Sequence, residues 1–234
     1  MPLYRRLRET IAGKITKGEY KPGEALPAEV EIARLYNVAP GTARKAIEEL
    51  VNEGLLERRH GAGTFVRRPN FNNSMLRFFL FRGTKGKTLT PESRIVSRSV
   101  ESASEAVAGH LNLPPGEKVI HLNRLRLWEG APRLLEDIYL PFTLFHPIID
   151  LDESVIGPLL YPAYEIHCGQ LVSFVKEEIS VTDATADDAA ILGLGAHEMV
   201  VNIDRLAMNP SRIPIEWRRS HGEARRFHYQ VDFS

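Results

Sequence analysis

Residues 26–66 read LPAEVEIARLYNVAPGTARKAIEELVNEGLLERRHGAGTFV, and this stretch decides the fold of the first part of the chain. A short helical pattern breaks near Asn37, and a second helical pattern stops at Gly54. A hairpin pattern with glycines in its turn follows. One more helix is predicted before the stretch, because apolar residues recur at helical spacing from Leu3 to Ile15. This order predicts a winged helix-turn-helix, a fold that reads DNA.

The second helical pattern has the features of a recognition helix. It opens with a proline, which suits a first helical turn. The apolar residues from Ala43 to Leu50 would face the core, which leaves Thr42, Arg44 and Lys45 on the exposed first turns. A recognition helix presents polar and basic groups there, because those turns enter the major groove.

The hairpin that follows predicts a wing. One strand ends at Arg59, a tight turn follows, and a return strand starts at Thr64. Gly61 and Gly63 would let the backbone approach phosphates closely, and Arg59 would add a charge-assisted contact. The alternative interpretation is a small helical subdomain whose basic face is exposed to solvent and does not bind DNA.

Composition and charge are those of an ordinary globular protein with a basic amino-terminal end. Residues 1–69 contain 13 Lys and Arg against 9 Asp and Glu, whereas the rest contains 17 against 21. Cys168 is the single cysteine, which rules out an internal disulfide and fits a reducing compartment. No apolar run approaches the roughly 18 residues that span a membrane, and the first residues lack a signal-peptide core. We therefore expect a cytoplasmic protein with no membrane contact.

Two segments of the remaining chain resemble each other, at residues 104–132 and 186–214. Each has the pattern of a short helix, a turn and a strand hairpin, with helix-capping signals at Ser102 and Thr185. We predict a duplicated α+β unit whose strands join into one antiparallel sheet with helices on one side. Chance similarity between two helix–hairpin segments is the alternative.

The first of these segments carries two arginines on one strand face. Arg124 and Arg126 are two residues apart and so point the same way, and the second segment keeps only the first of them, as Arg205. Two such arginines repel each other unless an anion or carboxylates lie opposite. Glu136 and Glu216, on the return strands, could form ion pairs with the arginines or help to bind a ligand. A surface Arg–Glu ladder across the sheet is the alternative.

The motifs of the first part resemble the GntR superfamily of bacterial transcription regulators. The matching pieces are Leu26–Glu29, Thr42–Arg44, Glu53–Leu55 and Gly61–Val66. The resemblance assigns DNA contacts to Thr42, Arg44, Gly61 and Gly63.

Residues 93–233 resemble the UTRA domain, the effector-binding module of the HutC branch of that superfamily, which has a chorismate-lyase-like fold. The resemblance rests on Arg124–Arg126, Leu135–Glu136, Leu140–Pro141, Leu192–Leu194 and Pro214–Glu216. It implies a small-molecule pocket lined by Ser93, Arg124, Arg126, Glu136, Ser173 and Glu216. In such a pocket the arginines would hold an anionic group and the carboxylates would take hydroxyl or amino groups.

These inferences combine into one expectation of an α+β chain in three parts. Residues 1–69 would form the winged helix-turn-helix, residues 70–92 a linker with a first strand, and residues 93–234 the ligand-binding domain. We expect a homodimeric repressor that binds double-stranded operator DNA under the control of a small anionic metabolite, with no cofactor.

Two alternatives remain open. The second domain could be a lyase- or hydrolase-like enzyme tethered to DNA, or the chain could be a metal-sensing regulator that uses His167 and Cys168.

Overall fold

The structure, a computed structural model, describes residues 1–67, 92–195 and 198–227. The chain divides into two compact units. The first contains residues 1–69 together with Gly169–Phe174 and Met208–Ile213, and the second contains the remaining residues. The predicted linker and first strand at 70–92 lie, except for Glu92, outside the described residues, so this boundary stays a prediction.

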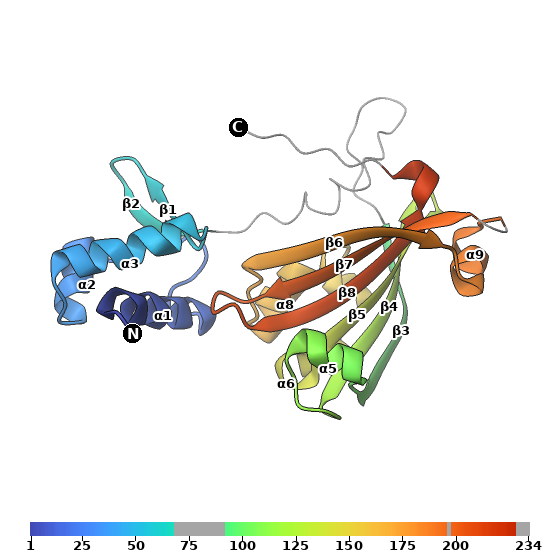
Figure 1. Cartoon of the computed structure of the whole chain (residues 1–234), viewed down its shortest axis with the longest axis horizontal. Coiled ribbons are helices and arrows are strands. Elements are labelled where there is room, and N and C mark those ends of the chain that lie inside the picture. The colour runs from blue at the N-terminus through green and yellow to red at the C-terminus, as the bar shows by residue number, and fades with distance from the viewer. Residues whose placement is uncertain (68–91, 196–197, 228–234) are drawn as a thin grey trace. The chain divides into compact units, whose positions relative to one another are not determined.

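The first unit has the element order of a winged helix-turn-helix (Figure 1). Its elements are α1 (Leu3–Thr16), α2 (Glu29–Leu35), α3 (Pro40–Asn52), β1 (Leu56–Arg59) and β2 (Gly63–Val66). Ala43, Ile47 and Leu50 of α3 are buried as predicted, and they pack with Ile11 of α1 and Ile32 of α2 in one apolar cluster.

The wing is a two-stranded antiparallel hairpin whose register runs from Leu56 opposite Val66 to Arg59 opposite Gly63. Gly61 and Gly63 have positive φ angles of 71° and 113°, a backbone conformation that residues with a β-carbon rarely adopt. The tight turn predicted from the glycines is therefore confirmed.

The second unit is built on a six-stranded sheet in the order β3-β4-β5-β8-β7-β6 (Figure 1). Its strands are β3 (Glu92–Ser102), β4 (Lys118–Trp128), β5 (Ala131–Pro141), β6 (Phe174–Asp183), β7 (Met199–Met208) and β8 (Pro214–Glu223). Its helices are α5 (Glu105–Leu111), α6 (Phe142–Phe145), η2 (His146–Ile149), α7 (Glu153–Ile156), α8 (Leu160–Cys168), α9 (Ala186–Leu192) and η3 (Ala224–Arg226). No helix among the described residues is long and apolar enough to cross a membrane.

The predicted repeat corresponds to two halves with the same element order. The first half is β3-α5-β4-β5 and the second is β6-α9-β7-β8, and the halves meet in the sheet at β5 and β8. The cap predicted at Thr185 is confirmed, because its hydroxyl accepts from the amide of Asp188 (3.1 Å). The cap predicted at Ser102 is wrong. Strand β3 extends to that residue, and Ser104 caps α5 by accepting from the amide of Val107 (3.3 Å).

Helices cover both faces of the sheet, which corrects the expectation of helices on one side. The repeat helices share a face, since α5 packs on Trp217 and α9 reaches His221 through Asp188, with 2.8 Å between Nδ1 and Oδ1. Glu216 points to the opposite face, because successive residues of a strand alternate. There the hydroxyl of Tyr164 on α8 donates to Glu216 (2.6 Å). Residues 142–168 thus bury the face that carries the predicted ligand-binding residues.

Candidate functional site

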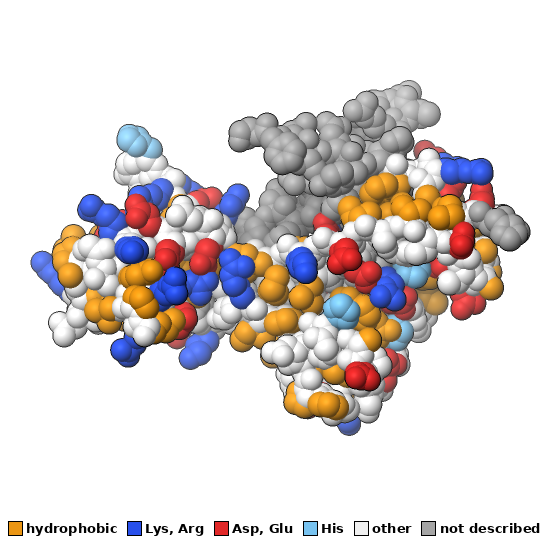
Figure 2. Space-filling model, in the orientation of Figure 1, with side chains coloured by type: hydrophobic (Ala, Val, Ile, Leu, Met, Phe, Trp, Pro, Cys, Tyr) orange, Lys and Arg blue, Asp and Glu red, His pale blue; other side chains and the backbone are white. Residues whose placement is uncertain are grey.

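The exposed first turns of α3 carry the predicted DNA-reading residues. The side chain of Arg44 is 69% exposed, Lys45 is exposed and Thr42 is half-buried. The Nζ of Lys45 lies 4.2 Å from the ring centre of Tyr4, which holds this cation beside α1. Figure 2 shows Lys and Arg side chains over the first unit, with carboxylates between them. The helix therefore presents two cations and one hydroxyl within a single turn.

The wing presents a third exposed cation. The guanidinium of Arg59 lies 4.2 Å from the ring centre of Phe65 and 2.7 Å from the carboxylate of Glu57, and its side chain is 52% exposed. Gly61 and Gly63 lie beyond it at the exposed tip. The structure thus places the predicted residues in two groups, one on α3 and one on the wing.

A carboxylate that the sequence interpretation did not assign to the DNA-binding surface links these two groups. Glu29, the first residue of α2, accepts from Nε of Arg44 (3.0 Å) with one oxygen and from Nη2 of Arg58 (3.0 Å) with the other. From the sequence alone, a glutamate at the start of a helix is expected only to interact favourably with the helix dipole. The partnership joins three elements, so local sequence spacing gave no signal for it.

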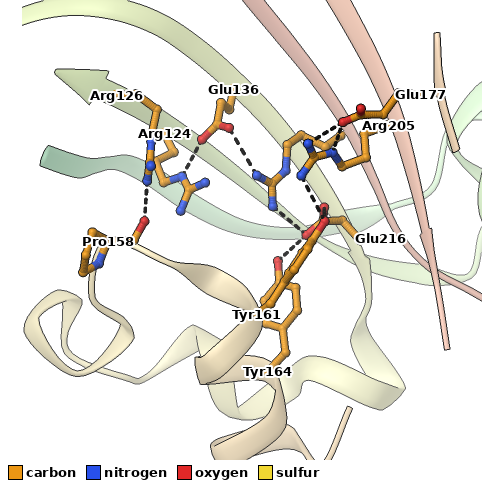
Figure 3. Close-up of polar contacts among 10 residues, drawn as sticks. Arg124, Arg126, Glu136, Pro158, Tyr161, Tyr164, Glu177, Arg205 and Glu216 are labelled. Carbon is orange, nitrogen blue, oxygen red and sulfur yellow. Dashed lines mark hydrogen bonds and ion pairs between the residues drawn. The ribbon is translucent and has the colours of Figure 1, made fainter. Parts of the chain in front are cut away.

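Four of the predicted ligand-binding residues, Arg124, Arg126, Glu136 and Glu216, lie in a buried polar cluster of the second unit (Figure 3). Arg124 lies opposite Glu136 in the β4–β5 register, and its Nε donates to Glu136 (2.6 Å). Arg218 of β8 donates from Nη1 to Glu136 (3.2 Å) and from Nη2 to Glu216 (2.8 Å). All four side chains are at most 3% exposed, so the alternative of a surface Arg–Glu ladder is wrong.

Two tyrosines of α8 and a second ion pair complete the cluster. Tyr161 and Tyr164 extend toward Glu216 in Figure 3, and their hydroxyls donate to its two oxygens at 3.3 Å and 2.6 Å. Arg205 of β7 donates from Nε to Glu177 of β6 (2.6 Å). Sequence interpretation missed both tyrosines and Arg218. For Arg218 a signal existed, because it lies two residues after Glu216 and so shares its face.

Arg126 differs from the other arginines of the cluster. It is 1% exposed, it donates to the carbonyl of Pro158, and no carboxylate of the described residues lies within ion-pair distance of it. Burial lowers the pKa of Arg126 to about 10, with Arg124 and Arg218 adding to this effect and Glu136 opposing it. The Nε of Arg126 and the Nη1 of Arg124 have no hydrogen-bond partner in the part of the chain that the structure describes.

Glu136 is held as a carboxylate by the arginines around it. Burial by itself would raise its pKa, but Arg124, Arg218 and Arg126 outweigh burial and lower the pKa to about 2. The cluster as a whole contains four guanidinium groups and three carboxylates. They belong to Arg124, Arg126, Arg205, Arg218, Glu136, Glu177 and Glu216.

The two predicted serines stand differently toward this cluster. Ser93 of β3 lies directly opposite Arg126 in the strand register and therefore shares its face. Ser173 precedes β6, and its amide donates to the carbonyl of Met208 (2.9 Å). The hydroxyl of Ser173 is buried without a hydrogen-bond partner among the described residues. A role of Ser173 in ligand binding stays a prediction.

The residues of the metal-sensing alternative do not form a ligand set with a third residue. Within residues 1–67, 92–195 and 198–227, no group of three or more His, Cys, Asp or Glu side chains is arranged to hold a metal ion. Burial raises the pKa of the Cys168 thiol to about 11, which disfavours the thiolate that binds metals.

Comparison with known proteins decides the family. Residues 3–66 match the model of the bacterial regulatory proteins of the gntR family, and residues 86–228 match the UTRA domain. The HTH-type transcriptional repressor NagR of Bacillus subtilis is 31% identical over 206 residues, which cover 88% of this chain and 84% of NagR. The chain belongs to the GntR family of bacterial regulatory proteins.

Two further relatives extend the likeness of this GntR regulator. The mannosyl-D-glycerate transport/metabolism system repressor MngR of Escherichia coli is 30% identical over 145 residues, 62% of this chain and 60% of MngR. The ligand-binding domain of a GntR-family regulator from Bordetella bronchiseptica superposes with a TM-score of 0.57 at 25% identity, over 62% of this chain and 92% of that domain. The chain is accordingly a transcription regulator and not the DNA-tethered enzyme of the alternative.

Proposed function

We propose that this GntR regulator is a homodimeric cytoplasmic repressor whose affinity for operator DNA is controlled by a small anionic metabolite bound in its UTRA domain. One observation carries the effector part of the proposal, namely the buried guanidinium of Arg126, which has no carboxylate of residues 1–67, 92–195 or 198–227 within ion-pair distance. A buried charge without a counter-charge is costly, and an anion at this place would remove the cost.

The surroundings of Arg126 favour the binding of an anion. The Nη1 of Arg124 and the Nε of Arg126 have no hydrogen-bond partner among the described residues, and both can donate to oxygens of the same ligand because the two residues share a strand face. Ser93, opposite Arg126, would add a hydroxyl. The relatives support the class of ligand: the Bordetella structure is of a ligand-binding domain, and the name of MngR refers to a glycerate, which is a carboxylate.

The DNA part of the proposal assigns roles to two groups of residues. Thr42, Arg44 and Lys45 of α3 would read or position the major groove. The wing residues Arg59, Gly61 and Gly63 would contact the phosphate backbone or the minor groove. A homodimer would have two such winged helix-turn-helix units, called heads below. They would bind two half-sites about 34–36 Å apart, or a multiple of that distance, on a near-palindromic operator.

The two activities would be coupled by linkage. A ligand that favours one placement of the heads in the dimer weakens binding to an operator whose half-site spacing demands another placement. The coupling is reciprocal, so the operator must weaken ligand binding by the same factor. Identical ligand affinity with and without operator would contradict this mechanism.

The proposal is tested in two steps with the full-length protein. An operator is first obtained by selecting bound duplexes from a random-sequence library. Phosphosugars, amino sugars and organic acids are then screened by thermal shift, and each stabilising compound is titrated against the protein–operator complex. We expect at least one anionic compound to change operator affinity.

Two variants locate the effector site. Arg126→Met should abolish the effect of that compound, because it removes the guanidinium that lacks a carboxylate partner in the described part of the chain. Arg219→Gln on the opposite face of β8 is the matched control, since Arg219 is exposed and pairs with Asp204 (3.0 Å). If Arg126→Met responded to the compound as the wild type does, the proposed binding site would be wrong.

A further inference from the structure

Arg218 contacts both carboxylates that the UTRA resemblance assigns to ligand hydroxyl or amino groups. One guanidinium spans Glu136 at 3.2 Å and Glu216 at 2.8 Å, and all three side chains are at most 3% exposed. The place where a ligand cation would meet these carboxylates is therefore taken by a cation of the protein itself.

The remaining oxygens of the two carboxylates also have protein partners. The other oxygen of Glu136 accepts from Arg124 (2.6 Å). Glu216 accepts from Tyr164 (2.6 Å) at the oxygen that Arg218 contacts, and from Tyr161 (3.3 Å) at the other oxygen. A ligand hydroxyl or ammonium group would have to displace one of these buried protein partners. It would thereby break a charge-assisted hydrogen bond, which is a strong kind of hydrogen bond.

Arg218 also accounts for the charge balance of the cluster. Without it, the three guanidinium groups of Arg124, Arg126 and Arg205 would equal the three carboxylates in number. With it, the cluster has one more cation than anion, which attracts an anionic ligand group and repels an ammonium group.

We propose that Arg218 is a specificity-determining residue that closes the two carboxylates to the effector and weakens the binding of effectors that carry an ammonium group. This inference rests on the proposed function, because it concerns the same binding site. The effector class that follows is a compact anion recognised mainly through Arg124 and Arg126, without a cationic group. Replacing Arg218 with a neutral side chain opens Glu136 and Glu216 to an amine.

Three probes test the proposal by isothermal titration calorimetry of the full chain at pH 7. Glucose 6-phosphate and glucosamine 6-phosphate differ in one group, a hydroxyl in the first and an ammonium in the second. Inorganic phosphate reports on the anion-binding arginines alone. We expect wild-type protein to bind all three, with glucosamine 6-phosphate weaker than glucose 6-phosphate by about tenfold, the size of one charge-assisted interaction.

The variants separate charge from folding. In Arg218→Gln the preference should reverse in favour of glucosamine 6-phosphate, while phosphate still binds. Arg218→Lys keeps the charge and should keep the wild-type preference, so it also serves if the Gln variant does not fold. Arg219→Gln, the exposed neighbour on the other face, should behave as wild type.

Three results would overturn the inference. They are an unchanged preference in Arg218→Gln, a reversed preference in Arg218→Lys, and the failure of all three probes to bind the wild type. These results can be told apart from a failure of the proposed function. That function fails only if no compound of the wider screen changes operator affinity.

Discussion

The Nε of Arg44 donates a hydrogen bond of 3.0 Å to Oε2 of Glu29, so an exposed arginine of the recognition helix is held by a carboxylate from the start of α2. The other oxygen of Glu29 accepts from Arg58 of the wing at the same distance. The free protein therefore presents these two arginines with a negative charge between them. If DNA binds at this surface as proposed, its phosphates come near that charge, and the arginines must exchange or share their partner.

Glu29→Gln should increase the affinity for random-sequence duplex DNA and make binding more dependent on salt. Both arginines become available to phosphates. Each added phosphate contact makes the negative slope of log K against log salt steeper by about 0.9. Fluorescence anisotropy at four salt concentrations measures the slope. Glu105→Gln, on α5 of the second unit, controls for the loss of one charge. Equal slopes for wild type and Glu29→Gln would show that the carboxylate does not restrain the arginines.

Arg44→Ala and Lys45→Ala should weaken operator binding in different ways. A base-edge contact of Arg44 is worth about 1–3 kcal/mol and its loss should relax sequence preference at one position. A phosphate contact of Lys45 should instead weaken binding to all sequences alike. Gel-shift titrations on operator variants distinguish the two, with Lys17→Ala, at the far end of α1, as a charge-matched control. Unchanged binding by Arg44→Ala would refute its role.

Glu136→Gln should reduce the free energy of unfolding by about 3–5 kcal/mol at pH 7, because it leaves the buried guanidinium of Arg124 without its carboxylate partner. The pKa of Glu136 lies near 2 instead of 4.5, so the stability from its ionised form is complete above pH 4.5 and is lost as the pH falls through about 2. The difference between variant and wild type should therefore narrow below pH 4.5.

Urea unfolding at several pH values measures this difference. Asp137→Asn is the control, because Asp137 lies on the opposite face of β5 and its side chain is 27% exposed. A half-exposed pair contributes about 0–1 kcal/mol, so the loss should be smaller. A similar loss in both variants would mean that the buried cluster adds no special stability.

The two repeat helices should differ in how much their caps contribute. Thr185→Ala removes a reciprocal capping box, in which Asp188 also accepts from the amide of Thr185 at 3.1 Å, and should cost about 1 kcal/mol. Ser104→Ala removes a single hydrogen bond of 3.3 Å and should cost less. Urea unfolding of both variants compares them, and a larger loss at Ser104 would contradict the assignment.

The winged head could be predicted from the sequence because its signals are local. Helix periodicity, a proline at the first turn of α3 and positive-φ glycines in the wing each act within a few residues. The link through Glu29 could not be predicted in the same way. It depends on where three separate elements meet, and spacing along the chain does not report that.

The polar cluster could be predicted only in part. The sequence places Glu136 on the return strand of the hairpin that carries Arg124, and the structure shows that the two residues lie opposite each other. Their burial does not follow, because no periodic signal shows that residues 142–168 return to cover this strand face. The contacts of Tyr161 and Tyr164 depend on the same return of the chain.

The strand order makes the candidate receptor a shared property of the two related hairpins. Arg124 and Glu136 belong to one hairpin, whereas Arg205, Glu216 and Arg218 belong to the other, and the bond from Arg218 to Glu136 crosses the line where they join. Either hairpin alone would hold an incomplete set of these charges. If this cluster binds the proposed effector, binding requires both hairpins side by side, and a shift of one hairpin along the other would change which charges face each other.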